Sequence, residues 1–103
     1  TLFEVLEMDN RLFVVAVTYA QPGKEEELRK ALLTLVEFAK SEPGFVKYDL
    51  HVSEENPAEF LFYEIWDDQK SLDLHGDTSN MKAFGEKYGH LIKSTSMKKY
   101  QRA

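Results

Sequence analysis

The sequence predicts an α+β fold on two observations. Short segments rich in Val, Phe, Tyr and Ile have the composition of strands, and longer segments carry apolar residues at helical spacing. The two kinds of segment are mixed along 103 residues, a length typical of one domain, so we expect a single domain over residues 1–103. Residues 1–10 alternate only weakly in polarity and are expected to form an accessory N-terminal segment, such as a short strand.

The first half of the chain predicts a strand, a helix and a second strand. Residues 11–19 (RLFVVAVTY) are apolar on both faces, which is typical of a strand that is buried on both. Residues 24–40 repeat their apolar side chains with the period of an amphipathic helix, and Pro43-Gly44 follows its end. Residues 45–53 alternate as a strand, with Val46, Tyr48, Leu50 and Val52 on one face and Phe45, Lys47, Asp49 and His51 on the other.

The second half predicts a strong strand, two short helices and a last strand. Residues 60–66 (FLFYEIW) alternate so that Phe60, Phe62, Glu64 and Trp66 share one face. Asp67-Asp68 can supply the N-cap of a short helix that runs through His75, and Thr78 or Ser79 can cap a second one. The last strand is expected over about residues 94–100.

The predicted order β-α-β-β-α-β, with the second helix in two parts, is the ferredoxin-like arrangement. Its antiparallel sheet carries the helices on one face and leaves the other face open. We expect Leu61, Tyr63, Ile65 and Tyr48 on that open face, where they would form a large exposed apolar patch. A second copy packed face to face would cover this patch, so the chain is expected to form a symmetric homodimer.

The composition argues against several classes of function. The net charge of −5 disfavours a nucleic-acid surface, which needs a basic stripe, and disfavours anionic membranes. Four basic residues near the C-terminus are interpreted as the solvated side of the last strand: Lys93, Lys98, Lys99 and Arg102. The chain has no cysteine, which excludes disulfides and thiol chemistry. No apolar run approaches the ~20 residues that span a bilayer and no secretion signal is visible, so a cytoplasmic location is expected.

Several short motifs together resemble one known family. They are Pro22-Gly23-Lys24 before the first helix, Glu42-Pro43-Gly44 followed by Tyr48, the strand Phe62-Tyr63-Glu64-Ile65-Trp66, and then His75 and Phe84. Their order and spacing over about residues 11–93 resemble the antibiotic biosynthesis monooxygenase (ABM)-like domains. The resemblance implies a ferredoxin-like subunit that pairs with a second copy as a dimeric α+β barrel, with a cavity between sheet and helices in each subunit.

The resemblance leaves the activity open, because a fold does not determine chemistry. Some members oxidise aromatic phenols or quinols with molecular oxygen and no added cofactor, some cleave haem, and others act on small hydroxyketone-type metabolites. Asn80 departs from the family pattern, since many members have a second His at this position. Ala16 stands where the haem-degrading members have an Asn, which weakens the haem interpretation.

Three residues are the candidate catalytic groups. His75 is predicted to act as a general base toward a phenol, or as a hydrogen-bond donor to a developing oxyanion. Glu64 is expected in an apolar setting, where desolvation raises its pKa and suits it to proton transfer. Asn80 could hold a substrate oxygen through a hydrogen bond. The alternatives are a structural bond from His75 to a backbone carbonyl, and an ion pair of Glu64 with Lys or Arg on a neighbouring strand.

A small aromatic or apolar ligand is expected beside these groups. Trp66 would stack on its ring, and Phe62, Phe84 and Tyr88 would surround it. Tyr63 points away from Glu64 and is expected in the dimer interior, as is Tyr48.

No cofactor and no metal are predicted. The five glycines are scattered and form no phosphate-binding loop, and Asp73 and Asp77 are not spaced to converge with His75 on one point. The leading hypothesis is therefore a cofactor-independent monooxygenase acting on a small phenol or quinol. The alternatives are a non-catalytic module that binds a small ligand, and a haem-binding relative.

Overall fold

A computed structural model describes residues 1–2 and 10–103 of the chain. The expected accessory segment over residues 1–10 therefore lies mostly outside the described residues. The elements in chain order are β1 (Leu12–Ala20), α2 (Glu25–Ala39), β2 (Phe45–Val52), β3 (Glu59–Trp66), α3 (Gln69–Gly76), α4 (Ser79–Tyr88), the short 3-10 helix η1 (Gly89–Leu91) and β4 (Ile92–Tyr100).

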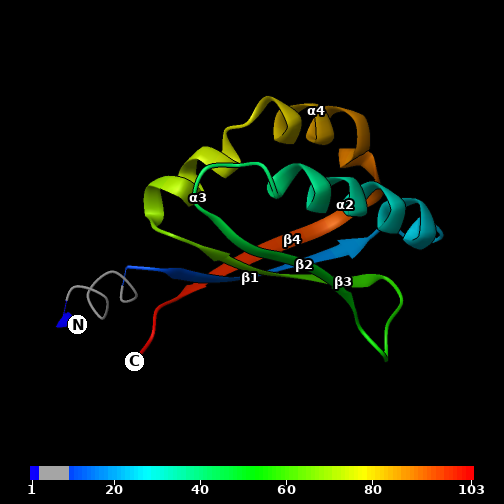
Figure 1. The fold of residues 1–103 in the computed structure, drawn as a ribbon. Coiled ribbons are helices and arrows are strands. Elements are labelled where there is room, and N and C mark those ends of the chain that lie inside the picture. The colour runs from blue at the N-terminus through cyan, green and yellow to red at the C-terminus, as the bar shows by residue number, and fades with distance from the viewer. Residues whose placement is uncertain (3–9) are drawn as a thin grey trace.

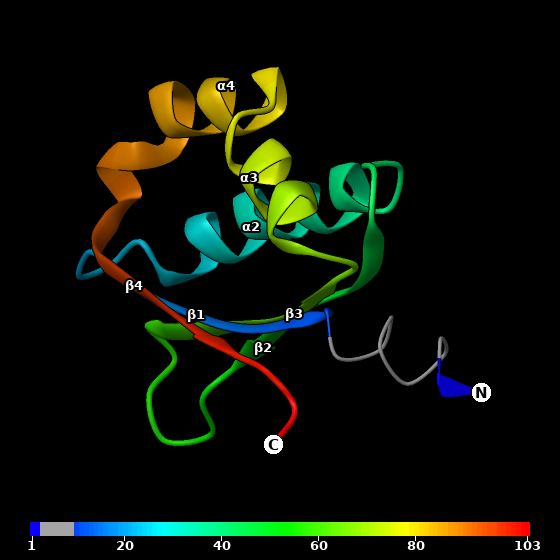
Figure 2. The same cartoon turned by 90° about the vertical axis from the view of Figure 1, so that its left-hand side faces the viewer.

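The four strands form one sheet in the order β2-β3-β1-β4, and all neighbouring strands are antiparallel. β1 and β3 are the central strands, as expected from their apolar composition. The helices α2, α3 and α4 lie over one face of the sheet, so these elements form two layers (Figure 1). In the edge-on view, α2, α3 and α4 leave the other face of the sheet uncovered (Figure 2). The α+β, ferredoxin-like fold predicted from the sequence is confirmed.

The core lies between the helices and the sheet, where alternate residues of the central strands meet the apolar side of α2. Val14 of β1 and Trp66 of β3 are fully buried, as are Leu28 of α2 and Leu91 of η1. Each completely buried aliphatic side chain contributes about 1.5–3 kcal/mol relative to exposure. This packing holds the helical layer on one face and fixes the floor of the site described below.

The N-caps of α3 and α4 set where these short helices begin. The Asp68 side chain accepts a hydrogen bond from the Ser71 backbone N–H at 2.8 Å, and the Thr78 hydroxyl accepts one from the Met81 N–H at 3.1 Å. Each bond satisfies a backbone donor that the first turn of a helix leaves free. The bonds from Ser71 hold the pKa of the Asp68 carboxyl below its usual value. Of the two expected caps for each helix, Asp68 and Thr78 are the ones used.

Two predictions for β2 are wrong. The register opposes Tyr48 to Glu64 of β3, which places Tyr48 on the helix-covered face, where it is 4% exposed. Tyr48 is therefore a core residue of the subunit and not part of the open face. The register also shifts between Phe45 and Lys47, and Phe45 lies opposite Trp66. Val46 is an extra residue in the strand, so Phe45 and Lys47 face opposite sides of the sheet although they were expected on the same side. Phe45 therefore packs on the core.

The open face of the sheet carries an apolar strip along the two central strands. Its members are Phe13, Val15 and Val17 of β1 and Leu61, Tyr63 and Ile65 of β3, all half-buried in the single subunit. We call these six residues the open-face strip. The four basic residues near the C-terminus are exposed as expected, but Lys98 and Lys99 lie on opposite faces of β4, because they oppose Val15 and Val14.

Candidate active site

A cavity of about 1030 Å³ lies between the helix-covered face of the sheet and the helices. The walls are mostly apolar and include side chains from both layers: Leu32, Leu35, Phe62, Leu72, Met81 and Phe84. Tyr48, Glu64 and His75 contribute polar groups. An apolar hollow with a few converging polar groups is the usual form of a small-molecule site.

His75 is carried into the cavity by α3. Ser71, Leu72 and His75 are the buried residues of this helix, and their spacing of three and four places them on one face. Because the Asp68 cap fixes the start of α3, it also fixes which side of the helix faces inward. His75 is 7% exposed and lines the cavity wall.

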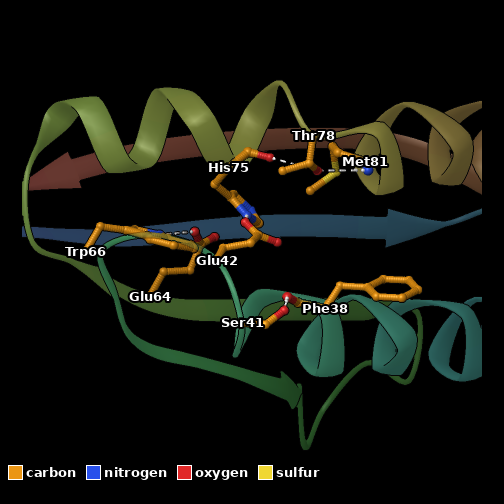
Figure 3. A network of polar contacts seen from close by, with 8 residues as sticks. All are labelled: Phe38, Ser41, Glu42, Glu64, Trp66, His75, Thr78 and Met81. Atoms are coloured by element: carbon orange, nitrogen blue, oxygen red, sulfur yellow. Dashed lines mark hydrogen bonds and ion pairs between the residues drawn. The ribbon is translucent and has the colours of Figure 1, made fainter.

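His75 forms a close pair with Glu42. The Nδ1 of His75 and the Oε1 of Glu42 are 2.6 Å apart, and the two side chains are 8% and 12% exposed. Glu42 lies in the turn between α2 and β2, and it reaches the imidazole from the side opposite α3 (Figure 3). The alternative expected from the sequence was a hydrogen bond from His75 to a backbone carbonyl. The ring instead contacts the carboxylate of Glu42. A bond of this kind is charge-assisted whenever the imidazole is protonated.

Glu64 forms a second buried pair, with Trp66 on the same face of β3. The Trp66 indole N–H donates to the Glu64 Oε1 at 2.9 Å (Figure 3). Burial raises the pKa of the Glu64 carboxyl, while the Trp66 bond and the nearby His75 partly oppose that rise. The alternative ion pair with Lys or Arg is not found for Glu64 among the described residues. The carboxylate is instead held by a neutral donor.

Aromatic rings fix the imidazole from two sides. The His75 ring lies 4.6 Å from the Trp66 ring and 5.0 Å from the Tyr48 ring, measured between centroids. Tyr48 in turn packs on Phe62 at 4.7 Å. Burial raises the pKa of the Tyr48 hydroxyl, and the negative charges of Glu64 and Glu42 raise it further, so this phenol stays protonated at ordinary pH.

Three polar atoms of these side chains remain open to the cavity. Among the described residues, every fully buried side-chain nitrogen or oxygen has a hydrogen-bond partner. The Nε2 of His75, the hydroxyl of Tyr48 and the second carboxyl oxygen of Glu64 have none there, so each must retain accessible surface. All three residues line the cavity, which therefore presents a ring nitrogen, a phenol and a carboxyl oxygen to a ligand.

The remaining predicted site residues separate into two groups. Phe62 and Phe84 line the cavity as expected. Trp66 is 0% exposed and lies behind His75 and Glu64, so as placed it supports these side chains and offers no ring face to a ligand. Asn80 is exposed on α4, and it lines a smaller hollow of about 290 Å³ together with Tyr88. The structure thus places His75 and Glu64 in the wall of the same cavity and leaves Asn80 and Tyr88 outside it.

The sequence reasoning missed Glu42 and misplaced Tyr48. Glu42 stands in a polar turn, where an acidic residue is usually solvated, and its partner is 33 positions away. No local pattern links the two. For Tyr48 a usable signal existed, because the polar residues Lys47, Asp49 and His51 alternate with it and mark the opposite face as the less buried one.

In residues 1–2 and 10–103, no group of three or more His, Asp or Glu side chains is placed to hold a metal ion. Within the same residues, no helix is long and apolar enough to cross a membrane.

Comparisons with known proteins agree with this geometry. An uncharacterized Synechocystis protein is 32% identical over 84 residues, which cover 82% of this chain and 57% of that protein, so the match spans little more than half of the relative. YcnE of Bacillus subtilis, named as a candidate monooxygenase, is 32% identical over 74 residues, 70% of this chain and 76% of that protein. The crystal structure of PA3566 from Pseudomonas aeruginosa superimposes with a TM-score of 0.87 at 28% identity, covering 93% of this chain and 97% of that one.

The family description "Antibiotic biosynthesis monooxygenase" matches residues 11–87, which contain β1 through most of α4 and every polar residue of the cavity described above except those of β4. This match covers well over half of the chain and agrees with the fold and with the resemblance seen in the motifs. The chain therefore belongs to the antibiotic biosynthesis monooxygenase family.

Proposed function

We propose that the protein is a monooxygenase that oxidises a small aromatic substrate, of the phenol or quinol type, with molecular oxygen in the cavity between sheet and helices. The family supports monooxygenase chemistry in general. The observation that carries the substrate class is the cavity itself, which combines apolar walls with a histidine whose Nε2 is open to it. Apolar walls suit a flat aromatic body, and a neutral imidazole suits the proton of a weak acid such as a phenol.

His75 takes the substrate proton in this proposal, and Tyr48 and Glu64 hold the substrate oxygen. The resulting anion is a much better electron donor than the neutral substrate, so it can pass an electron to oxygen directly. For an anthrone-type substrate the balance is complete: the ring CH₂ loses two hydrogens and gains one oxygen atom as a carbonyl, and the second oxygen atom leaves as water. The substrate supplies all the electrons, so the reaction needs no other reductant. The protein deprotonates, orients and shields the substrate.

Glu64 contributes through its raised pKa. A carboxyl that holds its proton above the usual range can donate a hydrogen bond to a developing oxyanion, which an ionised carboxylate cannot do. The sequence predicts Asn80 as the hydrogen-bond partner of the substrate oxygen. Because Asn80 is exposed on α4, we assign this role to Tyr48 and Glu64 inside the cavity instead.

Oxygen uptake with a panel of hydroquinones and anthrones tests this function. We expect uptake by the wild type and a loss of about 100-fold or more in His75→Gln, the usual contribution of a positioned base. His90→Gln is the matched control, because His90 is exposed and does not line the cavity. Equal rates for the wild type and His75→Gln across the panel would refute the proposal.

A non-catalytic binding module is the second candidate, and the largely apolar walls are the observation that favours it. It predicts saturable binding of the same aromatic compounds, followed by intrinsic Trp66 fluorescence, with no oxygen uptake. The haem interpretation predicts a Soret shift that depends on His75. We expect no such shift, because Ala16 places a methyl group in the cavity wall where a polar side chain would be needed.

We also propose that the protein is a homodimer that pairs through the open-face strip. The strip places six apolar side chains on the sheet face that α2, α3 and α4 leave uncovered (Figure 2). Apolar patches of this kind on single subunits usually mark an interface.

A further inference from the structure

The Glu42–His75 pair has a role that the proton-transfer proposal leaves unassigned. We propose that Glu42 is a positioning residue: it holds His75 as the tautomer with its proton on Nδ1, so that the lone pair of Nε2 faces the cavity as the base. This rests on the proposed function for the identity of the proton donor, whereas the tautomer itself is a property of the resting protein.

The chemistry of the contact selects the tautomer. An ionised carboxylate can only accept hydrogen bonds, so the ring nitrogen that faces it must donate. The Nδ1–Oε1 separation of 2.6 Å leaves room for one proton and nothing else between the two atoms. A neutral imidazole has a single N–H, and placing it on Nδ1 leaves Nε2 unprotonated. That nitrogen is the one open to the cavity.

The backbone around Glu42 fixes the carboxylate in place. Its N–H donates to the Ala39 carbonyl at 3.0 Å, and its carbonyl accepts from the Phe45 N–H at 3.2 Å. Two residues on, the Gly44 carbonyl accepts from the Asp67 N–H at 2.9 Å, which joins the turn to the end of β3. The turn is therefore tied to α2, β2 and β3 at once. A base held by such a support loses little entropy when it is brought to its working geometry.

Glu42 also carries a charge opposite in sign to the one that develops on the imidazole ring. When Nε2 takes a proton the imidazole becomes a cation, and a carboxylate 2.6 Å away in a poorly solvated site stabilises it. The other titratable or charged groups that face the cavity are Tyr48 on β2, Glu64 on β3, Asp73 and Asp77 at α3, and Lys99 on β4. Glu64 is already bonded to the Trp66 indole, so Glu42 is the carboxylate in contact with the ring.

Nitrogen NMR tests the tautomer without any substrate. Long-range ¹H–¹⁵N spectra distinguish a protonated from an unprotonated ring nitrogen, and the chain has only three histidines. Spectra of His51→Gln and His90→Gln, both at exposed positions, assign the remaining signal set to His75. We expect His75 of the wild type to carry its proton on Nδ1. In Glu42→Gln we expect loss of this preference, because the amide NH₂ can donate to Nδ1.

The rate of oxygen uptake adds a second readout. In Glu42→Gln we expect the rate to fall about tenfold or more, because the base is no longer held as the productive tautomer. Glu42→Asp keeps an acceptor-only carboxylate and should recover part of the rate. Glu37→Gln is the matched control, because Glu37 lies exposed on α2 and pairs with Lys40 at 2.9 Å, away from the cavity.

The outcomes separate the two proposals. A wild-type His75 with its proton on Nε2, or a Glu42→Gln protein with unchanged tautomer and rate, would overturn the positioning role. If the tautomer is as expected but no compound of the panel supports oxygen uptake, the proposed oxidation fails and the assignment of Glu42 stands. Circular dichroism and urea unfolding of each variant establish that the fold is intact before either result is interpreted.

Discussion

Glu64 in the cavity wall and Glu42 behind His75 differ in what faces their charge. Glu42 is bonded to an imidazole that can become a cation, whereas Glu64 is bonded to the neutral indole N–H of Trp66. A neutral donor offsets only part of the cost of removing a carboxylate from water, so burial raises the pKa of Glu64. The raised pKa that suits Glu64 to share a proton with a ligand therefore also lowers the stability of the folded protein.

The pH dependence of stability follows from the direction of that shift. The folded-state pKa of Glu64 lies above its unfolded value of about 4.5, so the folded protein binds this proton more tightly than the unfolded chain. The free energy of unfolding therefore falls as the pH rises from about 4.5 through the raised pKa. Glu64→Gln cannot ionise and still offers an oxygen to the Trp66 N–H. We expect the variant to be more stable than the wild type at neutral pH, with the difference vanishing at about pH 4.

Urea unfolding at a series of pH values measures this difference. Glu59→Gln is a suitable control, because Glu59 begins the same strand but is not part of the cavity. A gain in Glu64→Gln that is the same at every pH would contradict the electrostatic explanation and point to packing instead.

At the scale of elements, local patterns in the sequence were sufficient for the strands and helices. Alternation predicted β3 and the inward face that carries Glu64 and Trp66, and helical spacing predicted α2. The two errors of placement arise in β2. The extra residue at Val46 shifts the register, and the side of the sheet that Tyr48 faces is decided by pairing with β3. Such facts depend on contacts between distant segments, which periodicity within one segment does not contain.

The same limit explains why only part of the site could be predicted. His75 and Glu64 were found because a helix and a strand carry them on predictable faces. Glu42 was not found, because its role depends on how the turn after α2 meets α3, a contact that spans 33 positions. The turn and α3 approach each other closely, because a Cβ at Gly44 would overlap the side chain of Ser71. Gly44 also has a positive φ of 74°.

Gly44→Ala tests how tightly the turn is held. The substitution adds a strained positive φ and an overlap with α3, so we expect a loss of about 2–4 kcal/mol in the free energy of unfolding. Gly23→Ala is the matched control: Gly23 also has a positive φ, of 80°, but a Cβ there meets nothing within 4 Å. It should lose only about 1 kcal/mol. Equal losses for both variants, measured by urea unfolding, would show that the approach of the turn to α3 is unimportant.

At the scale of the whole molecule, the two faces of the sheet differ in what covers them. One face is covered by the helices and contains the cavity, and the other carries the open-face strip. The strip is continuous because β1 and β3 oppose Phe13 to Ile65, Val15 to Tyr63 and Val17 to Leu61. Each of these side chains is half-buried in the isolated chain. The arrangement suits a self-complementary interface, in which a two-fold axis passes through the middle of the strip.

Leu61→Lys tests the proposed homodimer. Lysine in place of Leu61, at the Val17 end of the strip, is well solvated in a separate chain, so the fold should persist, but pairing would bury its charge. We expect the wild type to sediment as a dimer and Leu61→Lys as a monomer, with dimerisation weakened by about 100-fold or more, the equivalent of about 3 kcal/mol. Leu74→Lys makes the same change at a position 45% exposed on α3 and should leave the dimer intact. Analytical ultracentrifugation at micromolar concentrations distinguishes these states. A monomeric wild type would contradict the homodimer. A dimer that tolerates Leu61→Lys but not Leu74→Lys would place the interface elsewhere.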